Sequence, residues 1–145
     1  MRKFKFRLAP VRNLRQYAER EQKDVLAREQ HTLRLLEEEE EGLRVAYREW
    51  SARYLQICRS GTRPMEMVRI QSFLLELRTH AEDVAGRIYT QTAAVEQARQ
   101  LLLEKMQARK TIDALYGKQF HAYRHEQKIE MEKEIEEQVA ARWVR

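Results

Sequence analysis

Few residues of this chain have a type and spacing that could carry out chemistry. His121 and His125 stand four positions apart, which places both imidazoles on one face of a helix at a spacing that can hold a metal ion. No HExxH pattern and no cysteine or aspartate cluster accompanies them, so we predict no metal site. Cys58 is the single cysteine. A lone thiol cannot form an internal disulfide, and we interpret it as an ordinary residue rather than a nucleophile.

Sequence patterns for catalysis and cofactor binding are absent. The chain contains no GxxxxGK[ST], GxGxxG or GxSxG pattern, and its 4 glycines do not cluster into a phosphate-binding loop. Carboxylates are abundant, but catalysis by a pair of carboxylates needs a dry pocket that makes one pKa differ from the other. Two helices cannot enclose such a pocket. We therefore predict a protein that is not an enzyme and binds no cofactor.

The residues are arranged instead for long helices. Charged residues make up 35% of the 145 residues, and there are only 4 Gly and 2 Pro, a composition typical of coiled coils. From residue 70 onward, mostly apolar residues recur at steps of four and three, the repeat of a helix that supercoils against a partner. This downstream ladder consists of Ile70, Leu74, Leu77, Ala81, Val84, Ile88, Gln91, Val95, Ala98 and Leu102.

A second ladder with the same steps lies upstream and supplies the partner. Between the ladders, Gly61 can adopt the left-handed conformation that ends a helix, and Pro64 suits the first turn of the next helix. The upstream ladder consists of Leu33, Leu36, Glu40, Leu43, Tyr47, Trp50, Tyr54 and Ile57.

The two ladders predict an all-α fold, a long antiparallel two-helix coiled-coil hairpin with an overhanging C-terminal helix. We expect a single coiled-coil domain over residues 1–145. Its expected elements are a helix over about 10–58, a loop over about 59–64 and a helix over about 65–142. At 1.5 Å per residue, the second helix would be on the order of 110 Å long.

Facing residues of an antiparallel pair have residue numbers with a nearly constant sum, which gives a predicted register. Toward the open end this rule pairs Leu14 with Ile112. The upstream stripe shifts by one residue between Val25 and Leu33, which we interpret as a local relaxation of the supercoil. The first helix reaches back only to about Tyr116, so we expect some twenty residues of the second helix to project alone.

Charge is distributed unevenly along the chain, whose net charge is +5. Residues 1–15 carry only basic charges, whereas 37–41 and 126–137 are rich in glutamate. These runs fit solvated helix faces. The alternative is a basic end that docks on an acidic protein surface or on nucleic acid. No apolar run is long enough to span a bilayer and no secretion signal follows the basic start, so we predict a cytoplasmic protein.

Three segments carry a resemblance to a known family. Residues 4–15 read FKFRLAPVRNLR, residues 103–110 read LEKMQARK and residues 123–128 read YRHEQK. With these motifs the whole chain resembles the FliJ family, small coiled-coil proteins of the flagellar type III export apparatus. The resemblance implies a non-catalytic stalk that inserts into the hexameric ring of the export ATPase FliI, promotes its assembly and couples it to the export gate FlhA.

Partners and location follow from the same resemblance. It implies a protein that is a monomer by itself and is held at the cytoplasmic face of the inner membrane through its partners. Export chaperones are further implied partners, and nucleic acid is not one. Two other functions stay open: the equivalent stalk of a virulence-type secretion system or rotary ATPase, and a general coiled-coil scaffold that dimerises or binds nucleic acid.

The resemblance also implies two binding regions. The ATPase-facing set lies at the end that bears both termini and consists of Phe4, Phe6, Leu8, Val11, Arg12, Arg15, Tyr123, Glu126, Gln127 and Lys128. The gate-facing set lies toward the hairpin tip and consists of Leu43, Trp50, Phe73, Leu77 and His80. Packing between the helices is the alternative role for the apolar members on the ladders, and Phe73 is the preferred anchor because it stands one position off the ladder.

Overall fold

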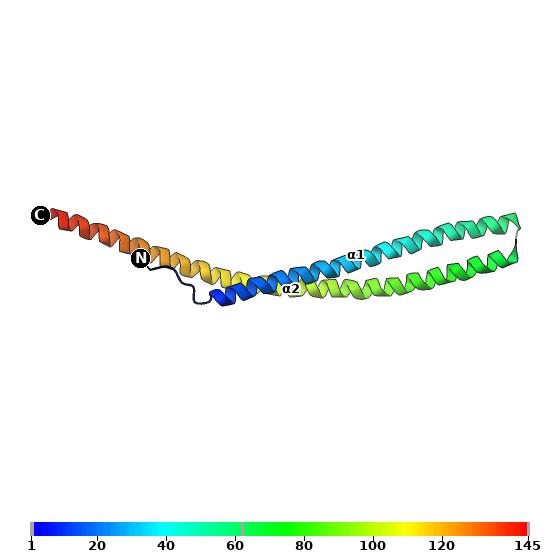
Figure 1. Cartoon of the computed structure of the whole chain (residues 1–145), viewed down its shortest axis with the longest axis horizontal. Coiled ribbons are helices and arrows are strands. Elements are labelled where there is room, and N and C mark those ends of the chain that lie inside the picture. The colour runs from blue at the N-terminus through cyan, green and yellow to red at the C-terminus, as the bar shows by residue number, and fades with distance from the viewer. Residues whose placement is uncertain (1, 62, 145) are drawn as a thin grey trace. The chain divides into compact units, whose positions relative to one another are not determined.

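The computed structural model describes residues 2–61 and 63–144, and two long helices make up most of them (Figure 1). Helix α1 spans Ala9–Ser60 and has 52 residues, and helix α2 spans Pro64–Trp143 and has 80. The described residues contain no strand. The predicted all-α class is therefore confirmed. Thr62, which belongs to the predicted loop, lies outside the described residues.

The connection between the helices has the conformation that the sequence predicts at Gly61. This glycine has a φ of 69°, in the left-handed region that ends a helix without a side-chain clash. Arg63 also has a positive φ, 47°, and its carbonyl accepts hydrogen bonds from the amides of Glu66 and Met67 at 3.1 and 3.4 Å. Pro64 opens α2, where a missing N–H leaves no helical hydrogen bond unmade.

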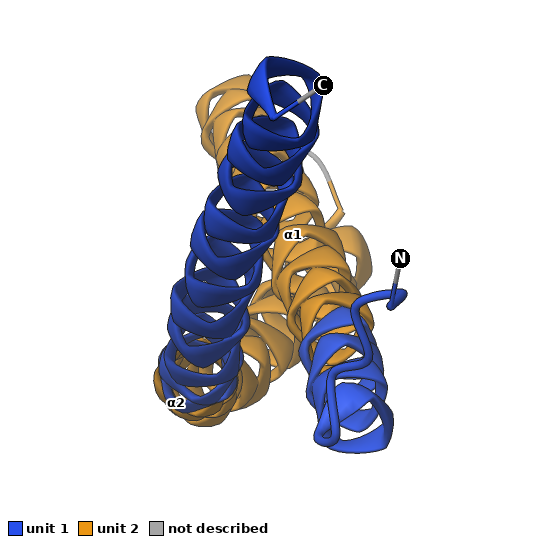
Figure 2. Cartoon of the chain, turned by 90° about the vertical axis from the view of Figure 1, so that its left-hand side faces the viewer, with its two compact units in different colours: residues 1–21, 102–145 blue, residues 22–101 orange. Residues whose placement is uncertain are grey.

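The chain divides into two compact units, each of which contains part of both helices (Figure 2). Unit 1 comprises Met1–Glu21 and Leu102–Arg145, and unit 2 comprises Gln22–Leu101. In unit 2 the two helices pack along the predicted ladders. Val84 is fully buried, and every member of the downstream ladder within unit 2 is buried or half-buried. The upstream ladder is half-buried except at Tyr47, which is 42% exposed.

The part of α1 that precedes Leu33 departs from the prediction. Val25 is half-buried there, but so is Leu26, and Gln22, Leu26 and Glu29 continue the steps of three and four to Leu33 without interruption. The predicted shift of the stripe between Val25 and Leu33 is therefore wrong. The ladder keeps its spacing, but several of its positions are polar.

Side-chain amides hold these polar positions to the neighbouring helix. The Nε2 atom of Gln22 donates a hydrogen bond to the carbonyl oxygen of Ala98 at 3.1 Å. From the other helix, the Nε2 atom of Gln91 donates to the carbonyl oxygen of Glu29 at 2.9 Å and also to its carboxylate. A polar residue on the ladder is thus tolerated because it bonds across to the opposite backbone.

Shortening the fully buried Val84 tests whether the ladder stabilises unit 2. We expect Val84→Ala to lower the free energy of unfolding by about 2 kcal/mol, because it removes two buried methyl groups and leaves a cavity. The matched control is Val68→Ala on the same helix, where the side chain is 60% exposed and the effect stays within about 0.5 kcal/mol. Urea unfolding followed by helical circular dichroism measures the free energy of unfolding of both variants. Equal decreases in the two would contradict a stabilising role of the buried ladder.

Candidate partner-binding surfaces

Unit 1 begins with a short segment before α1 that packs on α2. We call residues 2–8 the N-terminal strap. Its exposure alternates: Phe4, Phe6 and Leu8 are half-buried, and the intervening residues are exposed. One edge of the strap is therefore apolar, with Phe4 and Phe6 packed on α2, and the other edge is basic and exposed. Residues 7 and 8 form a turn, in which the amide of Ala9 donates a hydrogen bond to the carbonyl of Phe6 at 3.1 Å. Within unit 1, Figure 1 shows this segment running back alongside α2.

The apolar edge of the strap enters an aromatic cluster on α2. The ring of Phe4 lies 5.5 Å from Tyr116, 5.3 Å from Phe120 and 5.4 Å from Tyr123, measured between centroids. Phe6 lies edge-on to Tyr116 at 5.3 Å. Edge-to-face pairs at such distances each contribute about 0.5–1.5 kcal/mol beyond the area they bury. The strap is therefore docked by its aromatic side chains.

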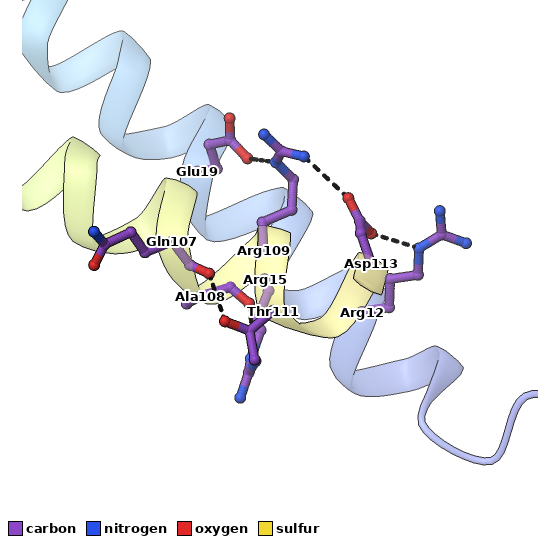
Figure 3. Close-up of polar contacts among 8 residues, drawn as sticks. All are labelled: Arg12, Arg15, Glu19, Gln107, Ala108, Arg109, Thr111 and Asp113. Carbon is purple, nitrogen blue, oxygen red and sulfur yellow. Dashed lines mark hydrogen bonds and ion pairs between the residues drawn. The ribbon is translucent and has the colours of Figure 1, made fainter. Parts of the chain in front are cut away.

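Beside the cluster, a chain of alternating charges joins α1 to α2 (Figure 3). Asp113 of α2 accepts hydrogen bonds from the Nε of Arg12 at 2.9 Å and from the Nη1 of Arg109 at 3.0 Å. The Nε of Arg109 also donates to the carboxylate of Glu19, whose exposed fraction is only 5%. Arg15 completes the contact by donating to the carbonyl oxygen of Ala108 at 2.9 Å.

These contacts shift the proton equilibria of two groups in the network. Hydrogen bonding from Arg12 is the main cause of a lowered pKa at Asp113, with a smaller contribution from Arg109 and an opposing effect of burial. Hydrogen bonds to Asp113 and then Glu19 raise the pKa of Arg109. Both groups are therefore charged at neutral pH. The guanidinium of Arg12 also lies 4.1 Å from the centroid of Tyr116, which couples the network to the aromatic cluster.

The apolar contacts that the sequence predicted for this end are not found. Leu14 is 67% exposed and Val11 is 36% exposed, whereas Ile112 is 4% exposed. The predicted pairing of Leu14 with Ile112 is therefore wrong. The face that α1 turns toward α2 carries Arg12, Arg15 and Glu19, which continue the steps of three and four from the rest of the helix. A search for apolar repeats misses such a face because its members are charged.

The structure brings together much of the ATPase-facing set. Phe4, Phe6 and Tyr123 meet in the aromatic cluster, and the hydroxyl of Tyr123 donates to the backbone carbonyl of Arg2. Arg12 and Arg15 lie in the charge network, and Leu8 is half-buried. The other members lie elsewhere: Val11 is on the exposed side of α1, and Glu126, Gln127 and Lys128 follow the cluster along α2.

Sequence reasoning missed the central members of this site. Tyr116 and Phe120 receive Phe4, while Glu19, Arg109 and Asp113 form the charge network. A signal for the aromatic residues was present, because positions 116, 120 and 123 repeat the ladder spacing of four and three. The charged residues carried no comparable signal in a chain so rich in charge.

The gate-facing set lies in unit 2. Leu43 and Leu77 line one open groove of about 450 Å³, together with Tyr47, Ala81 and the charged residues Glu40, Arg44 and Arg78. The lining of this groove is therefore partly apolar and partly charged.

The remaining members of that set make contacts of their own. The ring of Phe73 lies edge-on to Trp50 at 5.1 Å, and the guanidinium of Arg53 lies 5.0 Å from the centroid of Trp50. Phe73 therefore packs on Trp50 and remains 37% exposed. The Nε2 of His80 lies 3.0 Å from a carboxylate oxygen of Glu39.

Metal-binding clusters and membrane-spanning stretches are absent from the part of the chain that the structure describes. No three histidine, cysteine, aspartate or glutamate side chains gather there in an arrangement that could hold a metal ion. Neither helix has, among its described residues, a stretch both long and apolar enough to cross a membrane.

The lowered pKa of Asp113 predicts a pH dependence of stability. The carboxyl titrates near 3.8 when unperturbed and at lower pH in the folded protein, so its stabilising effect is complete above that value and is lost as the pH falls through the folded pKa. We expect Asp113→Asn to destabilise the protein by on the order of 1 kcal/mol at pH 7 and by less in acid.

Urea unfolding of the wild type and the variant from pH 7 to about pH 3 measures this difference. The control is Asp83→Asn, because the ion pair of Asp83 with Arg87 has both side chains more than half exposed. A gap between wild type and Asp113→Asn that stays constant across the whole pH range would contradict the assigned role of this carboxylate.

Comparison with known proteins adds an independent observation. The family model of the flagellar FliJ protein matches residues 4–145, which include all three motifs of the resemblance. No curated protein and no solved structure matches the chain. The match spans nearly the whole of the sequence, including both helices and most of the strap. The chain therefore belongs to the FliJ family, whose members are non-catalytic proteins associated with flagellar type III protein export.

Proposed function

We propose that this protein is the stalk of the flagellar export ATPase. In this proposal α1 and α2 form an antiparallel coiled coil, and the end of α2 projects beyond α1 as a single helix. The projecting helix enters the ring of the ATPase FliI and promotes assembly of the ring. The remainder of the molecule connects the ring to the export gate FlhA from the cytoplasmic face of the inner membrane.

The exposure of the end of α2 is the observation that carries the proposal. Gln127 is the last half-buried residue of the helix, and each residue from 128 to 144 is exposed although α2 continues to Trp143. A helix without packing partners over this length gains little stability from within the chain. Several of its exposed side chains are nevertheless large and apolar, namely Ile129, Met131, Ile135, Val139 and Trp143. Such residues fit a helix that is covered by a partner.

Contacts within each unit support the antiparallel arrangement. In unit 2, Glu39 meets His80 while the earlier Glu29 meets the later Gln91. In unit 1, Glu19 meets Arg109, and Phe4 meets Phe120. Within each unit a lower residue number on one partner thus accompanies a higher number on the other, as an antiparallel pair requires.

The two binding regions then have separate roles. We assign the ATPase contact to the end that bears the strap, the aromatic cluster and the segment 126–128. We assign the gate contact to the groove of Leu43 and Leu77 with the neighbouring ring of Phe73. This division places the two partners on different units of the chain.

Truncation tests the stalk. We expect removal of residues 128–145 to abolish stimulation of the cognate ATPase and its ring assembly, because the exposed stretch of α2 is lost while the aromatic cluster and the charge network are retained. Hydrolysis rates and sedimentation of the ATPase provide the two measurements. A shorter truncation that removes only residues 142–145 is the control and retains most of the stimulation. Full stimulation by the longer truncation would rule out insertion of this stretch.

Replacing Phe73 tests the gate contact. We expect Phe73→Ala to weaken binding to the purified cytoplasmic part of the gate protein by on the order of tenfold, as loss of an aromatic anchor does. The matched control is Leu75→Ala, which removes an exposed apolar side chain, 65% exposed, from the opposite side of the same helix. Calorimetric titration measures affinity, and circular dichroism measures helicity. A loss of helicity without a change in affinity would assign Phe73 to packing on Trp50.

A further inference from the structure

The basic edge of the strap is a surface that the contacts within the molecule do not use. Lys3, Lys5 and Arg7 are exposed and stand at alternate residues. Lys3 and Lys5 alternate with the docked Phe4 and Phe6, whereas Arg7 stands in the turn that precedes α1, which the amide of Ala9 closes by donating to the carbonyl of Phe6. Among the described residues, no acidic side chain forms an ion pair with any of the three, so the row of cations is available to a partner.

Docking of the strap holds this row in a fixed place. Phe4 is surrounded by three aromatic rings of α2, and the hydroxyl of Tyr123 donates a hydrogen bond to the carbonyl of Arg2. The two anchors lie on either side of Lys3 in the sequence. A docked row of charges loses less conformational entropy on binding than a free basic tail does. Arg124 is exposed beside the same cluster, with its guanidinium 5.9 Å from the centroid of Phe120.

We propose that the docked strap is a binding surface for an acidic, extended segment of a protein partner. In an extended segment, carboxylates at alternate residues share one face, so such a segment presents a row of negative charge to Lys3 and Lys5 and to Arg7 at the turn. The surface lies at the same end as the proposed ATPase contact, but the inference does not require that the partner be the ATPase.

The orientation of the aromatic residues distinguishes this partner from two other polyanions. Proteins that hold single-stranded nucleic acid present aromatic faces on which bases stack, and amphipathic helices that lie in a membrane surface present apolar side chains that enter the lipid. In the strap, Phe4 and Phe6 pack on rings of α2 and Leu8 is half-buried, so the exposed side chains are the charged ones. The surface therefore offers ion pairs alone, which suit a carboxylate-bearing chain.

A synthetic peptide of alternating glutamate and serine is the probe for this surface. We expect the full-length protein to bind it at low salt, and the affinity to fall at physiological salt because exposed ion pairs are screened. The variant Lys3→Glu/Lys5→Glu/Arg7→Glu binds on the order of tenfold more weakly, since three exposed pairs are lost. The matched control, Lys105→Glu/Lys110→Glu/Lys118→Glu, makes the same change of charge at exposed positions of unit 1 and binds as the wild type does.

A second variant separates a docked surface from a basic tail. Phe4→Ala keeps every charge but removes the ring that anchors the strap, so we expect it to weaken peptide binding while helicity is unchanged. If Phe4→Ala bound the peptide as tightly as the wild type does, docking of the strap on α2 would not contribute to binding, and that part of the proposal would be overturned. If the Lys105→Glu/Lys110→Glu/Lys118→Glu control lost as much affinity for the peptide as the strap variant does, the placement of the binding surface on the strap would be overturned. Binding of poly-dT or of vesicles of anionic phospholipid, more tightly than the peptide and dependent on the strap cations, would overturn the chemistry of the partner.

Discussion

A helix with a single helical neighbour can bury only one stripe of its surface, and that constraint governs this molecule. The stripe returns every three or four residues, and whatever side chain stands there must be satisfied by the opposite helix. In unit 2 most of these positions are apolar, with Val84 fully buried among them. In unit 1 α1 presents Arg12, Arg15 and Glu19 instead. The geometry of the ladder is kept while its chemistry changes.

This change alters what stabilises each unit. Burial of apolar surface stabilises unit 2, and this contribution involves neither screening of charges nor titration of a group. In unit 1 the ion pairs are partly exposed and each contributes little, while the buried carboxylate of Glu19 requires the guanidinium of Arg109 to offset its desolvation. The aromatic cluster around Phe4 supplies apolar burial that the ladder of α1 lacks at this end. The strap is therefore a structural part of unit 1 as well as a surface.

The sequence was informative where apolar spacing and turn chemistry determine structure. The downstream ladder from Ile70 and the left-handed Gly61 could be predicted, because hydrophobic periodicity and a glycine between two helical patterns are local signals. The first third of α1 could not. The prediction placed Leu14 on the face of α1 that packs on α2 because this residue is apolar, whereas it is 67% exposed. The packed face carries arginine and glutamate, which from sequence alone are read as solvated surface. Docking of Phe4 on Phe120 depends on contacts distant in sequence, for which one chain offers no periodic signal.

A charged ladder also defines register more strictly than an apolar one. Leucine positions tolerate a slip of one repeat, because one aliphatic side chain packs much like another. Two ion pairs of the charged ladder join the helices, Glu19 with Arg109 and Arg12 with Asp113, so a slip would separate both pairs and leave charges desolvated. A fixed register at this end determines where the strap leaves α1 and hence which rings Phe4 reaches. The charge network thereby sets the position of the strap and of the cations on its outer edge.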